Sequence, residues 1–259
     1  MQIEALPFVN WIFWTTITSG SLLVVGLTEL LGGTTRGYRL FMAWLLAAFA
    51  VVLVLSELAL PSGAAASATA ELRRPLIIGF AAGCIGYLVA SIAGWPRTWL
   101  AICAGALGLA TLIVLASAGG TDSVPLFAGQ LVLAALALGA VNAAMLLGHW
   151  YLVTPKLSPA PLRRMMWLLI GALVLQGVAF GLALLLVGRE PIDGGMAWLT
   201  WLRLGVGILL PLVATVLAIL ASRAASLQAS TGLLYIGLAL VMAGSIAGAS
   251  LSYLTGVPV

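Results

Sequence analysis

Long apolar runs alternate with short polar breaks along the whole chain. Each run comes close to the roughly 20 mostly apolar residues that a helix needs to cross the hydrocarbon core of a bilayer. The breaks are rich in the glycine, proline and small polar residues that form turns. The pattern therefore predicts membrane-spanning helices at about 9–31, 40–60, 75–93, 99–118, 125–149, 166–188, 197–222 and 231–254.

The composition agrees with eight membrane spans. Hydrophobic residues make up 63% of the 259 residues and charged residues only 7%. A soluble globular chain has about 25% charged residues, so this sequence cannot cover an ordinary water-facing surface. The 30 glycines fit the same class, because small residues let membrane helices approach closely. We expect an all-α integral membrane protein that forms one membrane domain over residues 1–259.

Two pairs of segments resemble each other at similar spacings. RLFMAWLLAAFAVV (39–52) resembles RRMMWLLIGALVLQ (163–176), and LRRPLIIGF (72–80) resembles WLRLGVGIL (201–209). Parallel internal repeats of this kind occur in membrane proteins that are built from two equivalent halves. The sequence thus predicts two four-helix halves, at about 1–120 and 121–259.

Basic residues are divided unequally between the two sets of loops. One set holds Arg36, Arg39, Arg97, Lys156, Arg163, Arg164 and Arg223, whereas the other holds Arg73, Arg74 and Arg189. Cytoplasmic loops carry the excess of Lys and Arg, so the first set is assigned to the cytoplasm. We expect a multi-pass protein of a bacterial cytoplasmic membrane with both termini outside.

Four ionisable residues fall inside the apolar runs, namely Glu29, Glu57, His149 and Arg203. Such residues mark functional sites by default. Under the predicted topology, Glu57 lies about 5 Å and Arg203 about 9 Å below the outer surface, at 1.5 Å per residue. We predict that the two form a pair. The pair is interpreted as a structural ion pair, as the wall of a pocket for a proton-exchanging ligand, or as two groups that reach the lipid headgroups.

Glu29 and His149 end their spans at the opposite face and are candidates for a proton relay. His149 is the only histidine, and beside two aromatic residues it also fits an interfacial group. One histidine cannot hold a haem by two imidazoles, although ligation by Met and His is possible in principle. Haem is therefore not expected, and no metal site is predicted.

Three short motifs carry a family resemblance. Glu57–Pro61 is similar to an acidic-or-His, Leu, x, x, Pro motif at the outer end of a second span. Asn10 stands at the outer start of the first span, and GVGILLPLVA (205–214) resembles a Gly-x-x-x-Pro stretch of a later span. With the layout of eight spans, these motifs resemble the membrane anchor subunits of polysulfide, nitrite and dimethyl sulfoxide reductases.

The resemblance implies a quinone, menaquinone or ubiquinone, bound near the outer face by Asn10 and Glu57. It also implies that electrons pass between quinol and an iron–sulfur subunit, in a complex that includes a catalytic subunit. Glu57 and Arg203 are the candidate reactive pair, and Tyr87, otherwise interpreted as a helix–helix contact, is a further candidate quinone ligand. The chain departs from the family pattern at Phe13, where a histidine would suit the pocket.

Two other functions remain open. A small secondary transporter is favoured by the repeat, by the glycine content and by Pro211, which is predicted to kink the seventh span. Its substrate groups should lie near the midplane, where the sequence offers Asn142, Gln176 and Tyr87. A structural subunit of a larger membrane complex is the third interpretation.

Overall fold

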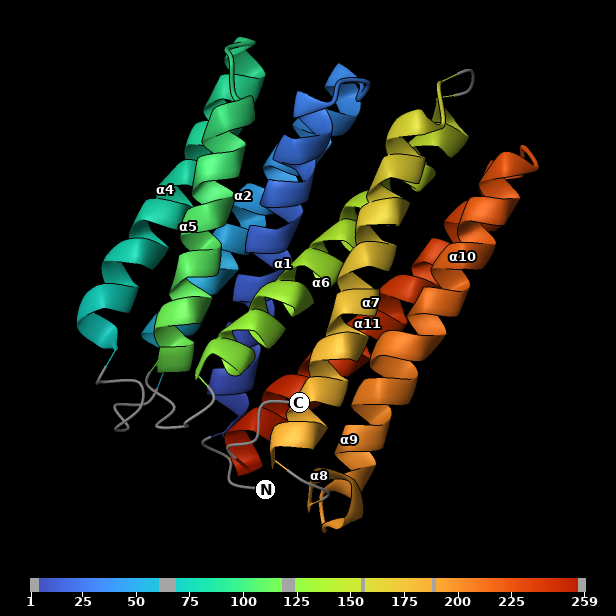
Figure 1. Ribbon diagram of the computed structural model, residues 1–259. Helices are drawn as coiled ribbons and strands as arrows, with labels where there is room; N and C mark the ends of the chain where they lie inside the picture. Colours follow the sequence, from blue (N-terminus) through green and yellow to red (C-terminus); the bar gives the residue numbers. More distant parts are fainter. Residues whose placement is uncertain (1–4, 61–68, 118–123, 155–156, 188–189, 256–259) are drawn as a thin grey trace.

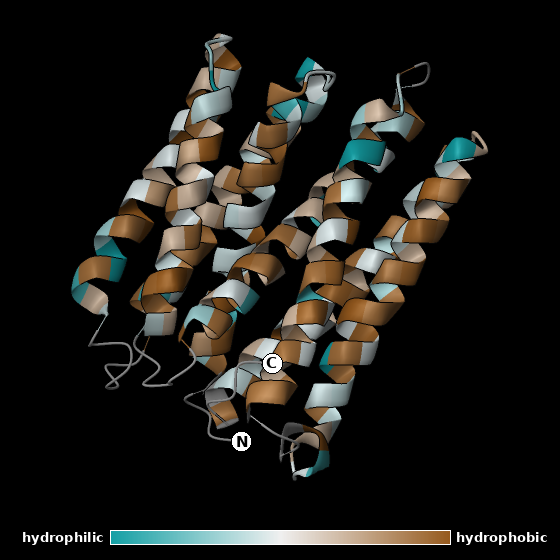
Figure 2. Cartoon of the chain, in the orientation of Figure 1, coloured by the Kyte–Doolittle hydropathy of each residue, from teal (hydrophilic) through white to brown (hydrophobic). Residues whose placement is uncertain are grey.

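The structure is a computed structural model that describes residues 5–60, 69–117, 124–154, 157–187 and 190–255. Over these residues the chain is all-α, and eight of its helical spans are long and apolar enough to cross a membrane (Figures 1 and 2). The fold class predicted from the sequence is confirmed. The elements are α1 (Ala5–Leu30), α2 (Arg36–Leu58), α4 (Ala70–Ala93), α5 (Thr98–Ser117), α6 (Val124–Val153), α7 (Ala160–Val187), α8 (Glu190–Asp193), α9 (Ala197–Leu204), η1 (Gly205–Leu209), α10 (Leu210–Arg223) and α11 (Leu227–Thr255).

Most helices begin before the apolar runs that predicted them, whereas several end one or two residues early, such as α2 at Leu58 instead of 60. α7 begins at Ala160, six residues before the predicted start at 166, and α4 begins at Ala70 instead of 75. An apolar run reports the thickness of the hydrocarbon layer, whereas backbone hydrogen bonding continues into the polar boundary zone. Arginines that were assigned to loops therefore lie in first helical turns, with consequences for the site described below.

The helices form two rings of four within the described chain (Figure 1). α1, α2, α4 and α5 pack in order around the first ring, and α6, α7, α9–α10 and α11 pack around the second. α1 and α6 make the main contact between the rings, with further contacts of α5 with α6 and of α1 with α11. The internal repeat predicted from the similar segments at 39–52 and 163–176 is a separate matter and stays a prediction.

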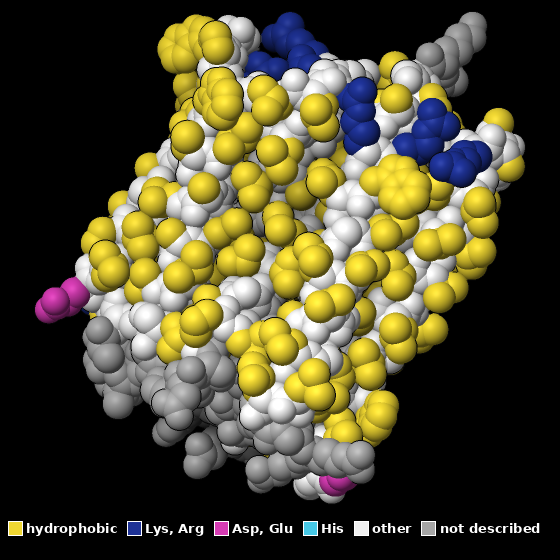
Figure 3. Space-filling model, viewed as in Figure 1, with side chains coloured by type: hydrophobic (Ala, Val, Ile, Leu, Met, Phe, Trp, Pro, Cys, Tyr) yellow, Lys and Arg dark blue, Asp and Glu magenta, His cyan; other side chains and the backbone are white. Residues whose placement is uncertain are grey.

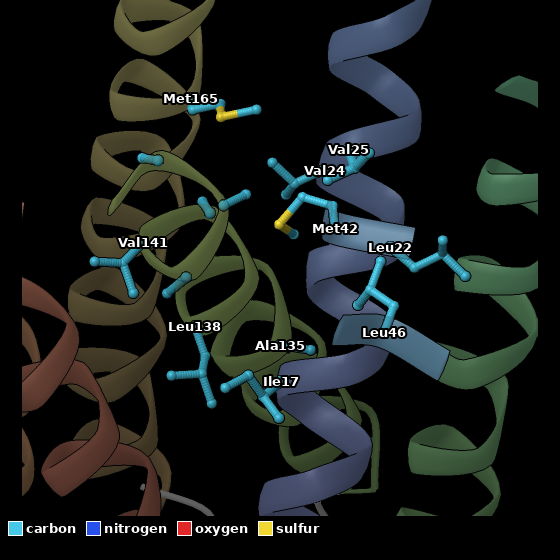
Figure 4. Close-up of a cluster of buried hydrophobic side chains, with 14 of the residues drawn as sticks. Ile17, Leu22, Val24, Val25, Met42, Leu46, Ala135, Leu138, Val141 and Met165 are labelled. Atoms are coloured by element: carbon cyan, nitrogen blue, oxygen red, sulfur yellow. The ribbon is translucent and has the colours of Figure 1, made fainter. Parts of the chain in front are cut away.

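The contact between α1 and α6 depends on two glycines. A Cβ atom at Gly139 would collide with the backbone of Gly20, so the two helix backbones touch at this point. Beside it, the Nδ2 of Asn142 donates a hydrogen bond to the Oγ of Ser21 over 3.0 Å. Apolar side chains of both helices, such as Ile17 and Leu138, complete the interface (Figure 4). Small residues and one amide thus join the two rings.

Charge differs between the two ends of the bundle. In Figure 3 the visible Lys and Arg side chains gather at the end where α1 joins α2 and α10 joins α11, and acidic side chains lie at the opposite end. We call these the basic end and the acidic end. Since successive spans run in opposite directions, α1 begins and α11 ends at the acidic end (Figure 1).

Candidate functional site

A buried ion pair stands at the acidic end, between the last turn of α2 and the first turn of α4. The Nη2 of Arg73 donates to the Oε1 of Glu57 over 2.8 Å, and the two side chains are only 1% and 7% exposed. The largely exposed Arg74 adds a second cation, with its Nε 3.6 Å from the same oxygen. Glu57 is thus paired with two arginines in the first turn of the next helix along the chain.

The predicted pairing of Glu57 with Arg203 is wrong. Because α4 begins at Ala70, Arg73 falls on the buried face of the first turn and reaches Glu57 from the adjacent helix of the same ring. Arg203 belongs to α9, which packs on α11 in the other ring. Both residues lie near the acidic end, as their predicted depths required, but on different sides of the bundle.

The first helix contributes a polar and aromatic face to the same place. Asn10 donates through Nδ2 to the Oγ of Ser56 over 2.9 Å and accepts from the Nε1 of Trp14 over 3.0 Å. The guanidinium of Arg73 lies 5.3 Å from the centre of the Trp11 ring, within cation–π range. Asn10 therefore lies beside the residue that precedes Glu57. We call this group the Glu57 cluster; it consists of Asn10, Trp11, Trp14, Ser56, Glu57 and Arg73.

Several buried polar atoms of the Glu57 cluster have no hydrogen-bond partner. These are the Nε1 of Trp11, the Oε2 of Glu57, and the Nε and Nη1 of Arg73. Buried polar atoms are nearly always paired, so each of them calls for an explanation. The set combines donors with one acceptor, which is the combination that binds a ligand bearing carbonyl and hydroxyl oxygens. Neither Trp11 nor Arg73 was among the candidates from the sequence, although LRRP placed an arginine close to Glu57.

A second polar cluster lies at the basic end, around Glu29 in the last turn of α1. The hydroxyl of Tyr87 donates to its Oε1 over 2.7 Å, and the Oγ1 of Thr98 donates to its Oε2 over 3.4 Å. The Nε atoms of Arg97 and Arg39 lie 3.4 and 3.8 Å from Oε1. A cavity of about 330 Å³ opens beside Glu29, Arg97 and Thr98.

This arrangement corrects the placement of Tyr87. We expected Tyr87 beside Asn10 and Glu57, but it lies 14 residues beyond Arg73 in α4, which is about 21 Å along a helix. Its hydroxyl is bound to Glu29 at the basic end. Tyr87 therefore belongs to the surroundings of Glu29 and has no contact with the Glu57 cluster among the described residues.

His149 is not joined to Glu29 by any hydrogen bond or ion pair of the described residues. It is exposed at the basic end of α6, and its Nδ1 lies 3.2 Å from the hydroxyl of Tyr235 in α11. The two residues face different helices. His149 lies on the face of α6 that packs on α11, whereas the partners of Glu29 come from α2, α4 and the start of α5. In the part of the chain that the structure describes, no three His, Cys, Asp or Glu side chains group as metal ligands.

Arg203, in the second ring, has no ion-pair partner among the described residues. It is 3% exposed, and its guanidinium lies against Gly248 of α11, where a Cβ atom would come within 3.1 Å of Nε. Neither its Nε nor its Nη1 has a hydrogen-bond partner. The π-helical turn η1 follows directly, and π-turns inside α-helices are frequent at functional sites.

Comparison of the chain with protein-family models, with curated proteins and with solved structures gives no match. The resemblance to reductase anchor subunits rests on the motifs alone and stays a prediction. The fold and the site define the class: a multi-pass helical membrane protein with buried ionic clusters at both ends of its first ring.

Proposed function

We propose that the protein is a quinone-interacting membrane anchor subunit of a respiratory oxidoreductase in a bacterial cytoplasmic membrane. The observation that supports the proposal is the Glu57 cluster, in which free donors and a free carboxylate oxygen lie together at one membrane boundary. A quinone headgroup enters a protein from the lipid and needs such groups at its two oxygens. The excess of arginine at the basic end supports an orientation with the acidic end outside.

Each residue of the cluster has a distinct role in this proposal. The indole N–H of Trp11 and the guanidinium of Arg73 donate hydrogen bonds to a carbonyl oxygen. The Oε2 of Glu57 accepts from a hydroxyl and takes up its proton. Oxidation of a quinol releases two electrons, which would pass to the iron–sulfur partner, and two protons, of which Glu57 would take one and water at the acidic end the other. Arg73 holds Glu57 in place, and the exposed Arg74 beside it marks the side on which a proton reaches water.

The chain needs partners and a small movement to work in this way. The free polar atoms are enclosed, so a ring reaches them only when a neighbouring side chain gives way. The sequence has no motif for a redox centre, and an iron–sulfur subunit at the acidic end, followed by a catalytic subunit, completes the path for electrons. These partners are part of the proposal.

Equilibrium binding of a short-chain quinone analogue to the purified protein tests the proposal. We expect saturable binding that is at least about tenfold weaker in Glu57→Gln and Trp11→Phe, since losing one hydrogen bond to a charged or buried group costs about 1.5–3 kcal/mol. Trp11→Phe removes the N–H together with the five-membered ring of a fully buried side chain, so its thermal midpoint is measured beside its affinity to separate binding from folding. Glu71→Gln, which changes an exposed acid at the same end, is the matched control.

The same variants are then assayed in the natively purified complex for quinol-linked turnover. Glu57→Gln should lower turnover, whereas Glu71→Gln should leave it unchanged. Absence of saturable binding to the wild-type protein, or equal binding and turnover in Glu57→Gln, would refute the proposal.

A small secondary transporter is the second candidate function, and the α9–η1–α10 span favours it. Irregular backbone at membrane depth is tolerated where it lines a cavity or packs against protein, and discontinuous helices build the substrate sites of many transporters. Here a buried arginine stands beside the π-turn. Solute counterflow in liposomes that contain only this chain would support this function over the first.

A further inference from the structure

We propose that Arg203 forms the centre of a binding site for a small inorganic anion of the size of chloride, enclosed between α1, α6, α9 and α11. The site lies in the second ring, apart from the Glu57 cluster, and does not depend on the proposed quinone function.

The charge of Arg203 has no counter-ion among the described residues. Arg203 is six residues past the start of α9, which places it about 9 Å along the span at 1.5 Å per residue. Glu29 and Glu57 are paired with other arginines, and Glu71 and Asp193 are exposed. A buried charge without a partner is very unfavourable, so an anion from solution is expected to fill this role.

Unpaired donors from three helices meet at the same place. Arg203, Gln130 of α6 and Ser245 of α11 line one small cavity. The Nε and Nη1 of Arg203, the Nε2 and Oε1 of Gln130 and the Oγ of Ser245 are buried and have no partner. Four of these five atoms can donate to an anion, and only the Oε1 of Gln130 is an acceptor alone.

Two other hydroxyls on the cavity wall are already used. Those of Thr16 and Ser252 donate to the carbonyls of Phe13 and Gly248 in their own helices, over 2.8 and 2.9 Å. Among the described polar side chains that line the cavity, those with unpaired donors are therefore Arg203, Gln130 and Ser245.

The size of the cavity limits the ligand. Its volume is about 20 Å³, compared with the roughly 10–15 Å³ that one water molecule requires. A single atomic ion fits with slight adjustment of the side chains, whereas a phosphate or an organic acid does not. Water would satisfy some donors but would leave the charge of Arg203 uncompensated, so a halide ion fits the site best.

The backbone around the site keeps the guanidinium in position. Gly248 leaves room for Arg203 to lie flat on α11. In η1 the Leu210 N–H bonds to the Gly205 carbonyl, and Gly207 packs against the backbone of Gly244. The arginine is therefore fixed between two closely packed helices before any ligand binds.

The test uses the detergent-purified full chain in chloride and in gluconate at equal ionic strength. We expect saturable broadening of the chloride NMR resonance and a thermal midpoint that rises with chloride concentration, because a ligand that binds only the folded state stabilises it by mass action. Arg203→Met should abolish both effects. Arg223→Met, which removes an exposed arginine at the basic end, should retain both.

Gln130→Glu is the second variant and guards against a loss of fold in Arg203→Met. It offers Arg203 a carboxylate from within the same cavity, so the protein should be as stable in gluconate as the wild type is in chloride, and chloride broadening should vanish. A wild-type protein with equal thermal midpoints in both salts holds water only and overturns the proposal. Broadening that persists in both variants overturns it as well. Quinone binding is measured separately, so either proposal can fail without the other.

Discussion

At the scale of single residues, the chain keeps two glutamates in its apolar helices by surrounding each carboxylate with arginines and hydrogen-bond donors of the first ring. Glu57 remains buried because Arg73 reaches it from the next helix, and the ring of Trp11 covers the guanidinium. Glu29 is surrounded in the same way by Tyr87 and Arg97. Both glutamates lie in the last turn of a helix, but Glu57 is paired from the next helix along the chain, whereas Tyr87 and Arg97 reach Glu29 from α4 and from the residue before α5.

The Glu57–Arg73 pair leads to a prediction about stability. Glu57→Leu alone should lower the free energy of unfolding by about 3–5 kcal/mol, because it leaves the charge of Arg73 buried and unpaired. Arg73→Met should lower it by less, because Arg74 remains 3.6 Å from the Oε1 of Glu57. The double variant should be more stable than either single variant, since no buried charge remains. Arg74→Met, at an exposed position beside the same carboxylate, should cost at most about 1 kcal/mol.

Unfolding of the purified variants in mixed micelles measures these differences. A double variant whose loss equals the sum of the two single losses would show that the charges do not depend on each other.

The sequence predicted the depth of Glu57 and Arg203 along their helices but not which residues they contact. Counting residues along a span gives depth, and Glu57 and Arg203 do lie near the same end. Depth carries no information on which side of the bundle a residue faces, and that choice depends on helix packing. Arg73 was overlooked because the hydropathy pattern placed it in a loop, whereas the helix had already begun.

At the scale of elements, the α9–η1–α10 span shows how one proline changes a membrane helix. Pro211 has no N–H to bond the carbonyl of Gly207, four residues earlier, and its ring crowds that carbonyl. The structure widens the preceding turn into η1, where the bond from Leu210 to Gly205 spans five residues. The sequence predicted a disturbance at Pro211, and the π-turn is the form that it takes.

The packing of η1 on α11 can be tested with a pair of glycines. A Cβ at Gly207 would lie 2.5 Å from the Cα of Gly244, which cannot move aside, whereas one at Gly205 meets nothing within 4 Å. Gly207→Ala should therefore lower stability by about 1–3 kcal/mol through overpacking. Gly205→Ala should be neutral or stabilise by up to about 1 kcal/mol.

Thermal unfolding in detergent compares the two variants. Equal midpoints for Gly207→Ala and Gly205→Ala would contradict the close approach of η1 and α11.

The eight spans could be predicted because a bilayer requires a fixed length of apolar residues, which is a local property of the sequence. The ends of α4 and α7 and the single turn α8 could not, since they lie where lipid headgroups and water replace the hydrocarbon and hydropathy loses its meaning. The same boundary zone holds the Glu57 cluster and the surroundings of Glu29. Sequence reasoning is thus weakest where this protein concentrates its polar chemistry.

At the scale of the whole molecule, the two rings divide the polar sites. The first ring holds both buried glutamates, and the second holds the buried Arg203 without a paired carboxylate among the described residues. The rings meet mainly along α1 and α6, and the hydrogen bond from Asn142 to Ser21 lies in that contact. Because α1 also lines the Arg203 cavity through Ile12 and Thr16, the position of one ring sets the shape of a site in the other.

The contact between the rings depends on Gly139, and this leads to the last prediction. Gly139→Ala would drive a Cβ into the backbone of Gly20, so α1 and α6 must move apart and stability should fall by about 1–3 kcal/mol. Gly129→Ala, ten residues earlier on the same helix and in open space, should change stability by no more than about 1 kcal/mol. Unfolding in mixed micelles gives both values. Equal losses at the two positions would mean that the rings do not meet at Gly20 and Gly139, whereas a loss confined to Gly139 would show that this crossing holds the two rings together.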